Sequence, residues 1–198
     1  MEFIDKTTIK INKVLNELDK LALDFTKILN QLDIKYVIIS GYVSILFGRS
    51  RASEDIDIIL EDVNFKKFNE LWNLLYQKFE CINTTNVKEA YESYLTTKHA
   101  IRFCYKEQFI PNMEIKFPKT DLDTWTLNER KKVIMNNNQF FISPIELQIP
   151  FKLFLGSEKD IEDAKYLYSI FKNKLDMSLL HEFNRKLKIE QLFNKHLR

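Results

Sequence analysis

Glycine, proline and cysteine are all scarce in this 198-residue chain, which has three, four and two of them respectively. So few glycines and prolines exclude a Gly/Ser linker and a low-complexity segment. The two cysteines, Cys81 and Cys104, form neither a CxxC motif nor a disulfide framework. We therefore expect free, buried thiols in a reducing compartment.

Long apolar runs and a strong net charge are also missing. No apolar stretch approaches the roughly 20 residues that cross a bilayer, and the first ten residues lack the apolar core of a signal peptide. We therefore expect a cytoplasmic protein without a membrane partner. Thirty basic residues against 28 acidic ones give a formal charge of +2. That balance neither demands nor forbids a polyanionic partner.

The apolar pattern predicts a globular α/β (α+β) protein with a small mixed sheet flanked by helices. Apolar residues at steps of three and four over 5–32 predict one amphipathic helix, or two in tandem. Residues 64–79 have the same helical spacing. Six segments are typical of strands, namely 36–40, 55–60, 99–105, 112–117, 132–135 and 139–143. The organisation we expect is an N-terminal helix packing on the core (1–33), a mixed core (34–142) and a C-terminal helical region (143–198).

The C-terminal helical region has a marked beginning. Ser143, Pro144 and Glu146 are a Ser cap, a proline at the first helical position and a glutamate at the third. Further on, Gly156 ends one helix, and Ser157 with its neighbours begins the next.

Two aspartates separated by one isoleucine end the stretch SGYVSILFGRSRASEDIDIIL (40–60). In a strand, Asp55 and Asp57 project to one face and the intervening isoleucine to the other. Paired carboxylates repel one another unless a cation neutralises them. Oxygen ligands of this kind suit Mg²⁺. Two surface acids on a solvated strand are the ordinary alternative for an isolated DxD pair.

A third acid strengthens the metal interpretation. Glu114 lies on the polar face of the strand at 112–117. If that strand pairs with 55–60, Glu114 joins Asp55 and Asp57, and three carboxylates can hold two metal ions. Upstream, Gly41 stands where a strand meets a short helix, where free N–H groups favour a phosphate. Gly48 is better explained as the end of that short helix.

Residues 36–57 resemble the signature of a known family. The pattern of a strand, Ser-Gly, a short helix and Gly-Arg-x-Arg-Ala-Ser-x-Asp-x-Asp is similar to the signature of the DNA polymerase beta-type nucleotidyltransferase superfamily. Within it, the stretch most resembles the small prokaryotic nucleotidyltransferases related to the AbiEii and MenT toxins and to minimal (MNT-type) enzymes. The resemblance implies a nucleotidyltransferase core whose cleft the C-terminal helices complete. It also implies transfer of an NMP from an NTP to an acceptor hydroxyl.

The resemblance extends to SPIELQIPFKLFLGSEKDIEDAKYL (143–167) and assigns roles residue by residue. It implies two Mg²⁺ (or Mn²⁺) ions on Asp55, Asp57 and Glu114. The residues that it places at the nucleotide, or that flank the implied site, are Ser40, Gly41, Arg49, Arg51, Lys152 and Lys159. Three positions depart from the family pattern: Ser40 replaces a glycine, Ser157 an arginine, and Glu114 the more usual aspartate.

Alternatives remain for the individual residues and for the whole chain. Asp160 suits a helix cap, Lys152 suits a solvated lysine, and Asp163 is four residues from Lys159. The acceptor can be tRNA, a protein or a small molecule, and a partner protein in a toxin–antitoxin pair fits the resemblance. The second function hypothesis is a catalytically silent nucleotide- or partner-binding module. The third is another DxD enzyme, such as a haloacid dehalogenase-like phosphatase.

Overall fold

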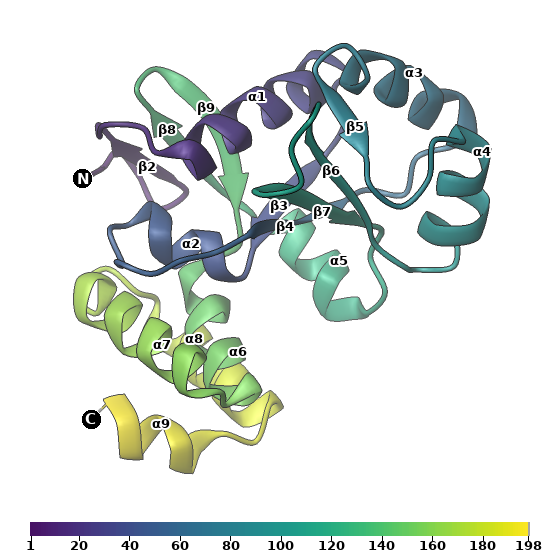
Figure 1. Ribbon diagram of the computed structural model, residues 1–198. Coiled ribbons are helices and arrows are strands. Elements are labelled where there is room, and N and C mark those ends of the chain that lie inside the picture. The colour runs from purple at the N-terminus through teal and green to yellow at the C-terminus, as the bar shows by residue number, and fades with distance from the viewer. Residues whose placement is uncertain (198) are drawn as a thin grey trace.

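The structure, a computed structural model, describes residues 1–197 and is a mixed α/β fold, as predicted (Figure 1). Its strands are β1 (Glu2–Phe3), β2 (Thr8–Ile11), β3 (Tyr36–Ile39), β4 (Asp55–Leu60), β5 (Phe79–Cys81), β6 (Ile101–Tyr105), β7 (Asn112–Lys116), β8 (Lys131–Met135) and β9 (Asn138–Ile142). Its helices are α1 (Glu17–Gln31), α2 (Gly41–Leu46), α3 (Phe65–Leu75), α4 (Val87–Glu89) with a following π-helical turn (Ala90–Leu95), α5 (Asp121–Asn128), α6 (Ile145–Leu155), α7 (Glu158–Phe171), α8 (Met177–Lys186) and α9 (Glu190–Leu197).

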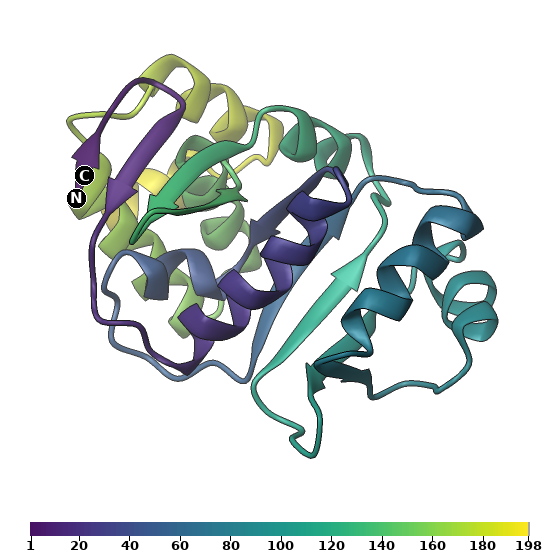
Figure 2. The ribbon, with the colours of Figure 1, turned by 90° about the horizontal axis from the view of Figure 1, so that it is seen from above.

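Within the described residues the strands form one mixed sheet in the order β1-β2-β8-β9-β3-β4-β7-β6-β5. Strand β4 lies between β3, which is antiparallel to it, and β7, which is parallel to it. Seen from above, α1 and α3 cover one face of the sheet (Figure 2). Helix α5 packs on β3 and β4 from the other side, and α6 to α9 form a separate helical block beneath it (Figure 1).

The two faces of β4 differ in what they bury. Ile56, Ile58 and Leu60 are fully buried and belong to the large core that lies beneath α1 and α3. On the opposite face, a small second cluster joins Ile59 to Val37 of β3 and Leu127 of α5. Because α5 covers only part of that face, the start of β4 stays accessible for polar chemistry.

The N-terminal helix expected over 5–32 begins later than predicted, at Glu17. Thr8–Ile11 instead forms β2, which pairs in parallel with β8. Asn16 caps α1, because its side chain accepts from the N–H of Asp19 while Asp19 accepts from the N–H of Asn16. The segment 1–33 therefore contributes two strands as well as the helix that packs on the core, and the division into three segments stays a prediction.

The expected Ser143 cap is also wrong. Pro144 occupies the N-cap position and α6 begins at Ile145. The N–H of Ser143 donates to the carbonyl of Ile38 at 2.9 Å, so this residue prolongs the β9–β3 ladder. No helix among residues 1–197 is long and apolar enough to cross a membrane.

Candidate active site

Three carboxylates lie on one face of the sheet. Asp55 and Asp57 alternate with buried isoleucines along β4, so both project away from the large core. In the parallel register of β4 and β7, Glu114 lies directly opposite Asp57. The pairing of these strands that the sequence suggested is therefore confirmed.

The electrostatics of this face show that its negative charge is only partly neutralised. The pKa of the Asp57 carboxyl is raised, first by burial and then by the charge of Asp55. Glu114 adds to the rise, whereas a hydrogen bond with Ser40 and the charge of Lys116 act against it. A further cation would relieve this repulsion.

Glu114 already has a cationic partner. Arg102 lies opposite it on β6, and Nε and Nη2 of Arg102 approach the same Oε2 atom of Glu114 at 2.8 and 2.7 Å. In this arrangement, no group of three or more Asp, Glu, His or Cys side chains within residues 1–197 is placed to hold a metal ion. The oxygen donors suit Mg²⁺ or Mn²⁺ by type. Glu114 would have to be shared with Arg102 or released by it.

The turn before α2 is strained at Ser40, the position where the family pattern has a glycine. Ser40 has φ 64° and ψ −136°, a conformation that favours glycine. The side-chain N–H of Gln148 donates to the carbonyl of Ser40 at 3.1 Å, which joins α6 to this turn. The fold keeps Ser40 in this conformation at an energetic cost.

Gly41 begins α2 and is buried, and it provides space for an arginine. A Cβ atom at Gly41 would overlap the guanidinium of Arg51. The close approach that the sequence predicted for a phosphate is made here by Arg51. Gly48, with φ 103°, ends the short helix as expected.

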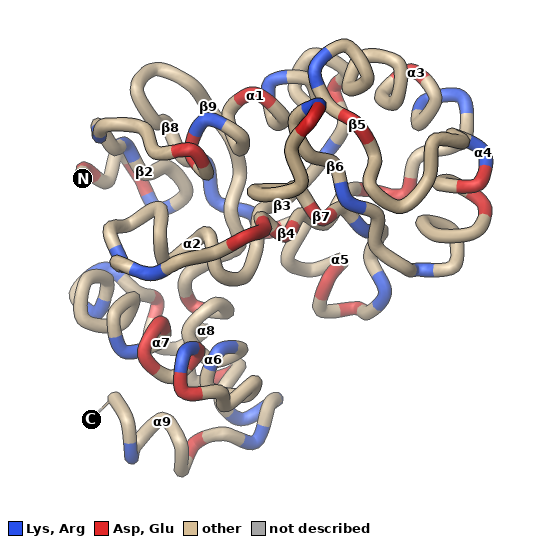
Figure 3. Tube along the Cα trace, in the orientation of Figure 1, with Lys and Arg blue, Asp and Glu red and all other residues tan. Residues whose placement is uncertain are grey.

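Three of the expected nucleotide-binding cations meet at Asp163, whose side chain is fully buried. Its carboxylate lies 2.8 Å from Nζ of Lys152, 3.1 Å from Nη2 of Arg51 and 3.5 Å from Nε of Arg49. Lys152 also contacts Asp160 at 3.2 Å. Figure 3 shows the basic residues in the loop between α2 and β4, which runs beside the helical block. We call these five residues the cation cluster.

The cation cluster has more positive than negative side chains and unused donors. It combines three cations with two carboxylates. Nε of Arg51 is buried without a hydrogen-bond partner among the described residues, whereas Nε of Arg49 has only the 3.5 Å ion pair with Asp163. Buried N–H donors normally find an acceptor. An excess of cations with unused donors therefore suits an anionic ligand.

The residues of the stretch 143–167 that were expected at the nucleotide lie in two places. One belongs to the cation cluster and the other lies on the surface. Lys152 is 1% exposed, so the solvated alternative is wrong for it. Lys159 is exposed in the first turn of α7, outside the cation cluster, and its nucleotide-binding role stays a prediction. The hydroxyl of Ser157 accepts from the N–H of Asp160, which confirms the predicted helix cap.

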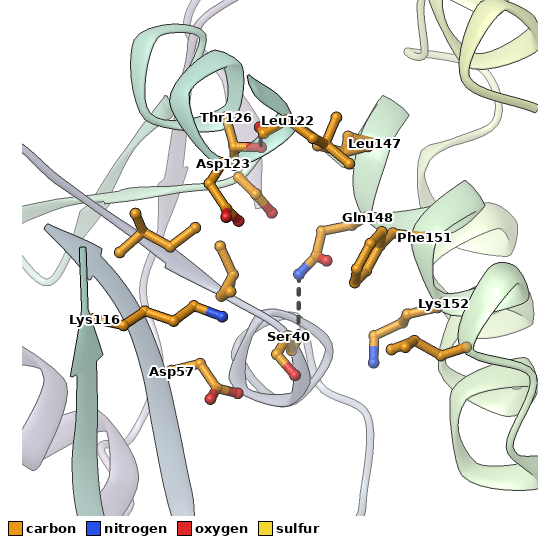
Figure 4. Close-up of a pocket in the computed structure, with 14 residues that line it drawn as sticks. Ser40, Asp57, Lys116, Leu122, Asp123, Thr126, Leu147, Gln148, Phe151 and Lys152 are labelled. Carbon is orange, nitrogen blue, oxygen red and sulfur yellow. Dashed lines mark hydrogen bonds between the residues drawn. The ribbon is translucent and has the colours of Figure 1, made fainter. Parts of the chain in front are cut away.

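We call the face of the sheet that carries Asp55, Asp57 and Glu114 the acidic face. A pocket of about 160 Å³ opens between the acidic face and α6 (Figure 4). Its polar lining includes Asp57 and Ser40 at one end, Lys152 at another, and Lys116 pointing inward. The apolar lining residues are Ile39, Ile59, Leu122, Leu147, Phe151 and Leu155. Apolar walls with a few polar groups are the usual lining of a small-ligand site, and the volume of this pocket is below the roughly 300–1,000 Å³ of such sites, so it would enclose only part of a nucleotide.

Sequence reasoning missed two residues of this region, Arg102 and Gln148, and the partners of a third, Asp163. Nothing in the sequence around Arg102 indicated a contact with Glu114, because it is one polar residue on a strand. Gln148 contacts the turn only because α6 folds back on β3. Asp163 was noted for its distance from Lys159, whereas its partners are more than a hundred residues upstream and in the preceding helix.

Comparison with solved structures identifies the fold. The chain is similar to an antigenic nucleotidyltransferase-like protein from Paracoccidioides brasiliensis, with a TM-score of 0.53 and 19% identity over 89% of each chain. It also matches a tRNA nucleotidyltransferase complexed with a primer tRNA and an incoming ATP analog (TM-score 0.36, 12% identity, 87% of this chain and 60% of that one). A tRNA-processing enzyme complex matches with a TM-score of 0.37 and 11% identity over 85% of this chain and 57% of that one.

Comparisons of sequence alone give no assignment. No family model matches the chain. A search of curated proteins likewise found no match. The first structural similarity therefore shows a nucleotidyltransferase-like fold, and it extends over most of both chains.

Proposed function

We propose that this protein is a metal-dependent nucleotidyltransferase that transfers an NMP from an NTP to an acceptor hydroxyl. One observation carries the proposal: Glu114 lies directly opposite Asp57 on the face that also carries Asp55. This face adjoins the strand–helix turn at Ser40 and Gly41. The nucleotidyltransferase-like fold supports the proposal.

In this proposal the acidic face holds two Mg²⁺ or Mn²⁺ ions through Asp55, Asp57 and Glu114. When bound, the ions neutralise charge on the phosphates and activate the attacking oxygen. Asp55 and Asp57 would hold both ions, and Glu114 would ligate the ion on the acceptor side and assist deprotonation of the acceptor hydroxyl. A bond forms between the acceptor oxygen and the α-phosphorus, the bond from that phosphorus to the bridging oxygen breaks, and pyrophosphate leaves.

The phosphates of the NTP, ATP among the candidates, would lie against the cation cluster. Arg51 lies against Gly41, and Lys152 both belongs to the cluster and lines the pocket. The buried Nε of Arg51, which has no hydrogen-bond partner among the described residues, favours an anion. The pocket beside Phe151 would take the nucleoside, and Lys159 would reach the phosphates from the rim.

The proposal extends to the acceptor and to the biological setting. RNA, a protein side chain or a small molecule could supply the hydroxyl. We propose a cytoplasmic enzyme without a membrane partner. The proposed link to toxin–antitoxin systems, with its partner protein, rests on the resemblance of residues 40–60.

A catalytically silent nucleotide-binding module is the second candidate, and a specific observation favours it. Arg102 occupies one oxygen of Glu114, and no three acids within residues 1–197 are placed around a metal ion. A silent module would bind NTP but would transfer nothing from it. Binding and transfer must therefore be measured separately.

The test is incubation of the purified protein with each α-³²P-labelled NTP, Mg²⁺ or Mn²⁺, and total RNA or cell lysate. We expect label on one acceptor class with the wild type and none with Asp57→Asn or with EDTA. Asp62→Asn, which removes an exposed acid outside the site, is the matched control and should label as the wild type does. Equal labelling by the wild type and Asp57→Asn would refute the site, and NTP binding without labelling would support the silent module.

A further inference from the structure

Arg102 is held against the acidic face by the sheet itself. It lies directly opposite Glu114 in the antiparallel register of β6 and β7. Both Nε and Nη2 approach one oxygen of Glu114, at 2.8 and 2.7 Å. Side chains at directly opposite positions of neighbouring strands are close enough to interact without a bend in the backbone.

The guanidinium also lies within the field of the other two acids. Glu114 raises the pKa of Arg102 most, and the charges of Asp55 and Asp57 raise it further. Arg102 is about half exposed, whereas Glu114 is mostly buried, so the guanidinium lies at the solvent side of the acidic face. Lys116 is a second cation near this face, and its charge lowers the pKa of Asp57.

A divalent cation and Arg102 therefore compete for the same negative charge. The Oε2 atom that receives both N–H groups of Arg102 is an oxygen that would ligate a metal. Two cations near one carboxylate also repel each other. This competition explains why three acids on one face do not form a ready metal site.

We propose that Arg102 is an internal counter-ion that positions Glu114 and weakens divalent-cation binding to the acidic face. The inference rests on the proposed function, because it assumes that Asp55, Asp57 and Glu114 hold the metal. Arg102 acts through Glu114 and touches neither nucleotide nor metal. The substrate phosphates bring extra negative charge, so the weak metal site is filled when the nucleotide arrives.

The experiment is titration of the nucleotide-free protein with Mn²⁺, followed by electron paramagnetic resonance of the free ion. Arg102→Gln should bind Mn²⁺ roughly tenfold more tightly than the wild type, which is the factor for a unit charge several ångströms from a divalent ion with water-like screening. Arg185→Gln makes the same change on the exposed surface of α8 and should leave the affinity unchanged. Circular dichroism melts establish that each variant is folded.

A double-mutant cycle separates action through Glu114 from general charge effects. In a Glu114→Gln background, Arg102→Gln should gain much less affinity than in the wild type. The inference is overturned if Arg102→Gln gains the same Mn²⁺ affinity in both backgrounds. It is also overturned if Arg102→Gln binds Mn²⁺ no more tightly than the wild type does. Either result leaves the proposed metal site intact. Two other results would refute the metal site of the proposed function together with the inference. One is equal Mn²⁺ binding by the wild type and Asp57→Asn. The other is no Mn²⁺ binding by either the wild type or Arg102→Gln.

Discussion

Replacement of Ser40 tests whether the turn before α2 is strained. The φ of 64° and ψ of −136° at Ser40 belong to a region where a side chain costs about 1–3 kcal/mol. Ser40→Gly removes that strain but adds about 0.5–1 kcal/mol of chain entropy to the unfolded state. Ser40→Ala keeps the strain and, like the glycine variant, lacks the hydroxyl that lowers the pKa of Asp57. The difference between the two variants therefore isolates the backbone.

We expect Ser40→Gly to be more stable than Ser40→Ala by about 1 kcal/mol. In a chain of this length, that difference raises the unfolding temperature by roughly 2–4 °C. Circular dichroism melts and urea titrations of the two variants measure it. If Ser40→Gly is no more stable than Ser40→Ala, the turn is not strained and the serine is a neutral replacement for the family's glycine.

Two other predictions concern buried carboxylates. Asp163→Asn should lower the free energy of unfolding in urea by about 3 kcal/mol, because three cations lose their shared partner. Phosphate should restore more of that loss than chloride at equal ionic strength, and an unchanged midpoint would mean that the cluster does not depend on Asp163. Tyr42→Phe should cost about 2 kcal/mol, since the buried Tyr42 hydroxyl donates to the Asp19 carboxylate at 2.8 Å. A loss near zero in the same titration would show that the other partners of Asp19 suffice.

The sequence predicted the parts of the fold whose pattern is local. Alternation along 55–60 identified β4 and its exposed face, and the pairing with β7 brought Glu114 opposite Asp57 as expected. The N-terminal strand β2 was missed because Ile11, Val14 and Leu15 also fit helical spacing. Its pairing with β8 depends on residues far along the chain, which no local pattern reveals.

The sequence predicted which kinds of residue form the candidate site, but it did not predict the ion pairs between them. Arg49, Arg51 and Lys152 were named for a phosphate, yet their common partner Asp163 was not. An ion pair between distant segments depends on how the helical block docks on the core. Arg102 was missed for a related reason, since only the register of β6 with β7 places it at Glu114.

The placement of the first strands at the edge of the sheet has a consequence for synthesis. One edge of β2 pairs with β1, but its other edge pairs with β8 and has no partner until the residues from Lys132 onwards are made. On a ribosome, which delivers the chain from its N-terminus, α1 and the central strands can assemble while the β1–β2 pair still lacks β8. The β1–β2 pair is therefore among the later parts of the sheet to be joined to the rest, and the free edge of β2 stays open to other chains until β8 is made.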